Sequence, residues 1–264
     1  MKMSEKVSRQ ETPCQQVLGQ KALKQKARAF LYGAALQWKL DMRSKSLLVA
    51  CYAVPLIFFL LMGGIFTSVM PEMKETLIQA MLVMGVSLGS FIGLPPTLVE
   101  TYGSEVKKTY RANGVPLWAG FAAMFISAFL HLATMCAAVI LLAPVLFGAV
   151  LPPHLPPFCV SLAVYIISSL FVGSLLGLAM KNQAKLTMIA QLIFLPSIML
   201  SGIMFPISFL PQAFATAGKL LPASWGYLLM LDGGLRFENL RYLLIVIFAS
   251  VLACAMLLRR HKVL

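Results

Sequence analysis

The chain has 264 residues, of which 59% are hydrophobic and only 12% charged, with 22 Lys and Arg against 9 Asp and Glu. Apolar windows of about 20 residues recur, which excludes an ordinary soluble domain and predicts an all-α polytopic membrane protein. A net charge of +13 would favour nucleic-acid binding in a soluble protein. Here the basic residues gather between apolar stretches, so we expect a lipid bilayer and no nucleic acid as partner.

The N-terminal part of the chain is polar and then amphipathic. Residues 1–26 lack apolar periodicity and predict a flexible cytoplasmic segment ahead of a transmembrane domain over residues 27–262. Within residues 27–46, apolar side chains recur at helical spacing among basic ones, with Trp38 on the apolar side. This pattern predicts a helix lying at the membrane surface, and the alternative is a helix packed on protein.

Six apolar stretches follow, each long enough to span a bilayer. Their approximate ranges are 47–69, 77–99, 118–143, 158–180, 186–205 and 240–258. Gly85, Gly89 and Gly93 form a ridge of small residues that favours close packing of another helix; a helix of the same chain is the favoured partner, and a dimer face is the alternative. Pro95-Pro96 predicts the end or a sharp bend of the second span.

Two loops on one side of the predicted bundle are rich in proline. Residues 152–157 contain four prolines and predict a non-helical loop. Residues 206–239 are apolar but interrupted by Pro206, Pro211 and Pro222, which predicts short re-entrant or interfacial helices. The alternative, a broken seventh span, would place the basic C-terminal tail outside the cytoplasm.

Charge asymmetry predicts the orientation of the six spans. With both termini inside, the cytoplasmic segments carry 18 Lys and Arg against 5 Asp and Glu, whereas the opposite side carries four of each. All the net positive charge then lies on one side, as expected for cytoplasmic loops of a multi-pass protein in the bacterial plasma (inner) membrane.

The sequence contains no recognisable catalytic motif. GxSxG, HExxH and the phosphate-binding GxxxxGK[ST] are absent, so we expect no enzyme activity, no metal and no cofactor in this chain. The spans also lack carboxylates, which a proton- or sodium-coupled carrier normally needs. Polar residues within the spans could line a path for an amphipathic molecule or could be hydrogen-bonding contacts between helices; the candidates are Ser87, Ser90, His131, Gln191, Ser197 and Ser201. For His131, packing is the favoured interpretation over a relay or ligand role.

Three segments together resemble the ABC-2 type transporter permeases. The loop Glu105–Trp118 is similar to the family's cytoplasmic loop after the second span, although Lys108 replaces its usual Gly. Asp41–Lys45 is similar to the basic approach to span 1. The family's signature near the end of span 5 is matched by Gly202, Pro206, Leu210, Pro211 and Pro222.

This resemblance implies a membrane subunit of an ATP-driven exporter of drugs, antibiotics, lipids or similar molecules. A second copy or a homologous permease is the implied membrane partner, and a separate ATPase subunit supplies ATP and Mg²⁺. A coupling helix after span 2 is implied to meet the ATPase; the residues at this contact are Glu105, Lys107, Lys108, Thr109, Arg111, Asn113 and Gly114. The alternatives are a stand-alone secondary carrier or a structural membrane protein.

Overall fold

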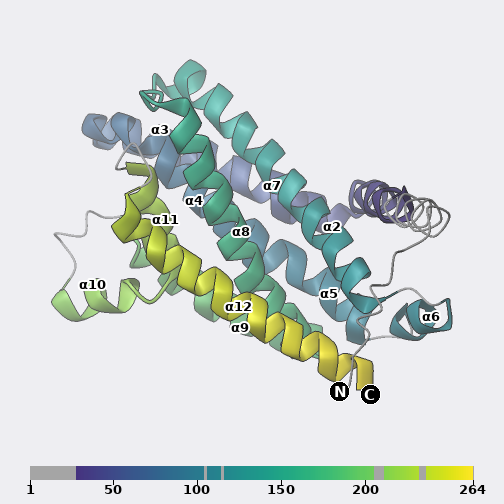
Figure 1. The fold of residues 1–264 in the computed structure, drawn as a ribbon. Helices are drawn as coiled ribbons and strands as arrows, with labels where there is room; N and C mark the ends of the chain where they lie inside the picture. Colours follow the sequence, from purple (N-terminus) through teal and green to yellow (C-terminus); the bar gives the residue numbers. More distant parts are fainter. Residues whose placement is uncertain (1–27, 104–105, 114–115, 205–210, 232–235, 264) are drawn as a thin grey trace, which may run out of the picture.

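The computed structural model describes residues 28–103, 106–113, 116–204, 211–231 and 236–263, which are almost entirely helical and form one bundle (Figure 1). A helix over residues 28–41, here called the N-terminal helix, precedes the bundle. The other helices are α2 (Lys45–Leu48), α3 (Val54–Val69), α4 (Leu77–Leu88), α5 (Leu94–Gly103), α6 (Val106–Ala112), α7 (Leu117–Phe147), α8 (Leu155–Ala179), α9 (Gln183–Met199), α10 (Gln212–Gly218), α11 (Pro222–Leu231) and α12 (Phe237–Val263).

Five helical stretches in the described part of the chain are long and apolar enough to cross a membrane. They are Lys45–Val69, Leu77–Gly103, Leu117–Phe147, Leu155–Ala179 and Phe237–Arg260. The remaining predicted span, the fifth in chain order (186–205), appears as α9, which is apolar but only 17 residues long. The all-α polytopic prediction is therefore confirmed, with five clear candidates for spans and one shorter helix.

Two of the long stretches contain a π-helical segment directly before a proline. These are η1 (Val49–Ala53), ahead of Pro55, and η3 (Gly89–Gly93), ahead of Pro95. The amides of Val54 and Leu94 donate to carbonyls five residues back instead of four. Proline lacks an amide and crowds the carbonyl four residues before it, so the wider turn lets the helix continue. The second stretch runs on to Gly103.

The proline-rich loop is shorter than predicted. The sequence analysis placed residues 152–157 outside any helix, but α8 begins at Leu155 and contains two of these prolines in its first turn. The first amides of a helix have no partner within it, so proline fits there without loss of a hydrogen bond. The prediction of a non-helical loop is therefore wrong for residues 155–157.

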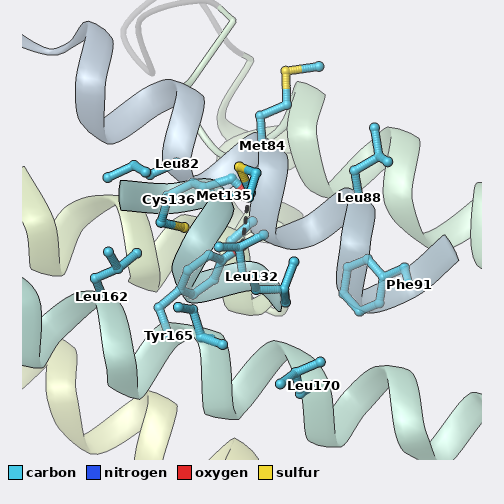
Figure 2. Close-up of a cluster of buried hydrophobic side chains, with 14 of the residues drawn as sticks. Leu82, Met84, Leu88, Phe91, Leu132, Met135, Cys136, Leu162, Tyr165 and Leu170 are labelled. Carbon is cyan, nitrogen blue, oxygen red and sulfur yellow. Dashed lines mark hydrogen bonds between the residues drawn. The ribbon is translucent and has the colours of Figure 1, made fainter. Parts of the chain in front are cut away.

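The bundle is built around α4, in which every residue from Leu77 to Leu88 is buried. Helices α7, α8, α3 and α11 pack around it. Figure 2 shows part of this core, where Tyr165 of α8 lies among Leu132 and Met135 of α7 and Leu82 of α4. The Tyr165 hydroxyl is 2.6 Å from Ser87 Oγ, which satisfies both hydroxyls in the apolar interior.

The glycine ridge on the second stretch packs within the chain, as predicted. A Cβ at Gly85 would lie 2.7 Å from Met135 Cε, and one at Gly89 would overlap the Leu132 side chain, both on α7. A Cβ at Gly93 would lie 2.8 Å from Cys51 Sγ of η1. Small residues therefore let α7 and η1 approach the central stretch closely.

An even closer contact joins α8 to η3 and α5. A Cβ at Gly173 would overlap the backbone carbonyl of Ser90, and one at Gly177 would lie 2.9 Å from the carbonyl oxygen of Pro95. Backbone atoms cannot rotate away as side-chain tips can, so only glycine allows this approach. The pair Gly173 and Gly177 fixes the position of α8 along η3 and α5.

The two ends of the bundle carry different elements. One end, called here the α6 end, holds α6, the N-terminal helix and the C-terminal end of α12 (Figure 1). The α8–α9 turn belongs to the same end, because Gln183 Nε2 donates to Glu100 Oε1 of α5 over 3.4 Å. The opposite end, the α10 end, holds α10 and η2 (Pro71–Glu75), where Val150 N–H donates to Lys74 O.

We predict that Gly173→Ala destabilises the bundle, because the added Cβ displaces the Ser90 backbone. Overpacking of this kind costs about 1–3 kcal/mol. The measurement is the apparent melting temperature of the detergent-purified chain. Gly64→Ala is the matched control, because its nearest neighbour would be 4.0 Å away. Equal melting temperatures for the two variants would contradict the close contact.

Candidate coupling surface and its anchors

Helix α6 is a short element that projects from the α6 end between α5 and α7 (Figure 1). The side chains of Val106, Lys108, Thr109, Ala112 and Asn113 are exposed. These exposed side chains define what we call the α6 surface. It presents polar and cationic groups outside the apolar bundle, where a soluble partner has access to them.

The predicted coupling residues lie together on and beside this helix. Lys107, Lys108, Thr109 and Arg111 belong to α6, and Asn113 follows it directly. Asn113 ends the helix, because its side-chain amide donates to the Thr109 carbonyl over 2.9 Å. Glu105 and Gly114 lie outside the described residues. A seven-residue helix thus brings three cationic residues into one short segment at the end of the bundle.

Two tyrosines, one at the end of α5 and one on α6, contact the first turns of α7. The Tyr102 hydroxyl, at the end of α5, donates to the Leu117 carbonyl over 2.7 Å, and its ring is buried. The Tyr110 ring of α6 packs over Gly120, where a Cβ would lie 2.8 Å from Tyr110 Cε2. Tyr110 therefore holds α6, and Tyr102 the end of α5, directly against α7. Sequence reasoning missed both tyrosines, since aromatic residues near a membrane surface are common.

A buried carboxylate attaches the N-terminal helix to the same helix, α7. Asp41 is 5% exposed, and its carboxylate accepts hydrogen bonds from the Ser127 hydroxyl and, over 2.8 Å, from the Gln37 side chain. A buried carboxylate without such donors would be strongly destabilising. The two hydrogen bonds therefore hold the end of the N-terminal helix against α7.

His131, the one ionisable residue predicted inside the third span, also contributes to this attachment of the N-terminal helix to α7. The Trp38 ring stacks on His131 with centroids 4.0 Å apart, and Tyr52 Oη lies 2.8 Å from His131 Nδ1. His131 Nε2 has no hydrogen-bond partner among the described residues. Trp38 was predicted to lie at the membrane surface, but its ring packs on protein instead.

The other candidates for path-lining residues differ in exposure. Ser87, Ser90, Ser197 and Ser201 are fully buried inside the closed bundle, whereas Gln191 is exposed on α9. Ser201 Oγ donates to the Ile198 carbonyl, and Ser90 and Ser197 have no partner among the described residues. The structure thus gathers most of these hydroxyls in the interior and separates Gln191 from them.

The signature segment near the end of α9 forms a tight turn and a second short helix. Gly202 has φ +86°, a left-handed conformation that favours glycine. Pro211 precedes α10 and Pro222 begins α11, while Pro206 and Leu210 lie outside the described residues. Trp225 Nε1 donates to the Lys219 carbonyl over 2.6 Å, which ties α11 back to the preceding turn.

A helical bundle with five stretches long and apolar enough to cross a membrane is the architecture of a multi-pass membrane protein. The sequence matches the ABC-2 type transporter family over residues 29–233, which is most of the chain. The protein therefore belongs to the ABC-2 type transporter family. Comparison with curated proteins and with solved structures gave no match.

We predict that Asp41→Ala and Trp38→Ala each release the N-terminal helix. The first leaves the Ser127 hydroxyl buried without its acceptor, at a cost of about 1–3 kcal/mol, and the second removes the stacking on His131. Amide hydrogen exchange over residues 28–41 should become faster in both variants. Lys39→Ala, at an exposed position of the same helix, should leave exchange unchanged; equal acceleration in all three would contradict the anchor.

We also predict that Tyr102→Phe loosens α6 while the bundle stays folded. The variant keeps the buried ring and removes the hydroxyl that donates to the Leu117 carbonyl, and each hydrogen bond lost costs a net of roughly 0.5–1.5 kcal/mol. Amide exchange in α6 and in the first turn of α7 should rise with little change in melting temperature. Tyr32→Phe, at an exposed position, is the control and should change neither measurement.

Proposed function

We propose that this protein is the membrane-spanning subunit of an ATP-driven exporter and that a separate ATPase subunit binds the α6 surface. The observation that carries the proposal is the position of α6: a cationic helix outside the bundle, joined to α7 through its own Tyr110 and flanked by the contact of Tyr102, at the end of α5, with α7. Acidic residues on the ATPase are the natural partners for Lys107, Lys108 and Arg111.

The need for an external source of energy supports the same proposal. The sequence has no GxxxxGK[ST] loop, so this chain does not hold ATP through that motif. The candidate spans also carry no carboxylate pair that could couple transport to an ion gradient. An ATPase that closes on ATP and Mg²⁺ would push on α6, and the two tyrosines would pass that movement to α7.

The proposed topology has six crossings, with both termini in the cytoplasm of a bacterium and α9 as the fifth. At 1.5 Å per residue the 17 residues of α9 are about 25 Å long, close to the hydrocarbon thickness of a bilayer. The helix begins beside Glu100 at the α6 end, and Leu200, just after it, packs against Gly218 of α10. The excess of Lys and Arg at the α6 end supports a cytoplasmic location for that end.

The proposed substrate is an amphipathic or lipid-like small molecule of the drug or antibiotic class. The interior of the bundle offers hydroxyls within an apolar environment, including the fully buried Ser90 and Ser197. Such a lining suits molecules with a few polar groups better than ions or long glycans. A second copy of this chain, or a homologous permease, would form the other half of the path.

The test of the proposed function is reversal of charge on α6. We expect the double variant Lys107→Glu/Lys108→Glu to insert normally and to lose most of its coupling between ATP hydrolysis and transport, because two attractive contacts with the ATPase become repulsive. The measurement is ATPase activity of the purified complex in proteoliposomes, with and without a panel of amphipathic compounds.

The matched control is Lys181→Glu/Lys185→Glu, which makes the same change in net charge at two exposed positions at the same end, one in the α8–α9 turn and one in the first turn of α9. We expect this variant to keep compound-stimulated ATP hydrolysis. Normal coupling in the α6 variant would refute the role of the α6 surface. Transport by the chain without any ATPase subunit would instead identify a secondary carrier.

A further inference from the structure

A groove of about 710 Å³ opens between the last turns of α8 and α12 at the α6 end. Its apolar walls include Leu175 and Ala179 from α8 and Ala253 and Leu257 from α12. Closer to the middle of the bundle the two helices touch, with Cys254 Sγ 3.8 Å from the Phe171 carbonyl. The groove therefore starts where this contact ends and opens toward the end of the bundle.

The α12 side of the groove runs along one face of the helix and ends in a positive charge. Ala253, Leu257 and Arg260 follow the i, i+4, i+7 spacing of a single face, so the apolar floor is about 6 Å long and Arg260 follows about 4 Å beyond it. Arg259 lines the groove beside Arg260, and both side chains are exposed. A ligand in this groove thus meets an apolar slot and then two guanidinium groups.

The mouth of the groove carries a net positive charge even when the partial negative charges of the two helix C-termini are included. Helices α8 and α12 both finish here, and each C-terminus contributes about half a negative charge. Two arginines add two positive charges, so a net positive charge of about one is left at the mouth. This balance disfavours a cationic ligand and favours an anionic group held by bidentate hydrogen bonds.

We propose that this groove binds an anionic phospholipid, with an acyl chain along the apolar walls and the phosphate on Arg259 and Arg260. The proposal rests on the proposed topology, which puts the α6 end at the cytoplasmic leaflet, where anionic headgroups meet basic pockets between helices. The volume lies within the range of sites for small molecules. The bound lipid would fill the space between α8 and α12 and hold their ends at a fixed separation.

The test is native mass spectrometry of the full chain, purified with the subunits that accompany it and titrated with lipid. The probes are phosphatidylglycerol and phosphatidylcholine with the same acyl chains. We expect about tenfold stronger retention of phosphatidylglycerol, because only its headgroup leaves a net negative charge for the two arginines. Inorganic phosphate at the same concentration should not compete, because it lacks the acyl chain.

Three variants separate the contributions. Arg259→Gln/Arg260→Gln should abolish the preference for phosphatidylglycerol, and Ala253→Phe should reduce retention of both lipids by filling the slot. Lys181→Gln/Lys185→Gln removes the same charge nearby and should keep the preference. An unchanged preference in the arginine variant would overturn the proposal, as would competition by inorganic phosphate.

The same spectra distinguish a lipid site from a contact between subunits. If Ala253→Phe converts dimers to monomers and leaves the number of bound lipids unchanged, the groove is an interface and the lipid proposal is wrong. Lipid binding is measured without ATP or transport. Its failure therefore leaves the coupling test on Lys107 and Lys108 unaffected, and loss of coupling there leaves the lipid result unaffected.

Discussion

The backbone contact between α8 and η3 is the constraint on which the arrangement of the bundle depends. Gly173 lies against the Ser90 carbonyl so closely that no side chain fits between the two helices. This contact holds α8 on one side of the central stretch, and the ridge at Gly85 and Gly89 receives α7 on another. With both neighbours fixed, the direction of α5 is set, and so is the place where α6 leaves the bundle.

The first half of α7 is the common support for both elements at the α6 end. Leu117 and Gly120 hold the α5–α6 region through the two tyrosines, and Ser127 and His131 hold the N-terminal helix through Asp41 and Trp38. These four positions lie within about 21 Å along one helix. Two elements of the α6 end that are far apart in the sequence therefore meet on one helix, α7.

The sequence predicted the helical stretches well, because apolar length depends only on local composition. Pro95 was predicted to end or sharply bend its helix; the helix does not end there, because a π-turn before Pro95 lets it continue to Gly103. Charge alone predicted the segment that forms α6. The anchors were not predictable in the same way, since Asp41 gains its partner from a residue 86 positions away. A single sequence carries no record of such a pairing.

The separation of 86 residues between Asp41 and Ser127 also determines the order in which the two partners are synthesised. The N-terminal helix leaves the ribosome before the third long helix, α7, has been made. Asp41 is therefore synthesised before Ser127, the residue that donates a hydrogen bond to it. At 5–20 residues per second the delay is about 4–17 s. During that interval Leu31 and Tyr32, still exposed in the finished fold, can keep the early helix on the lipid surface. The buried carboxylate thus makes the final docking of the N-terminal helix a late step, possible only after the third helix is in the membrane.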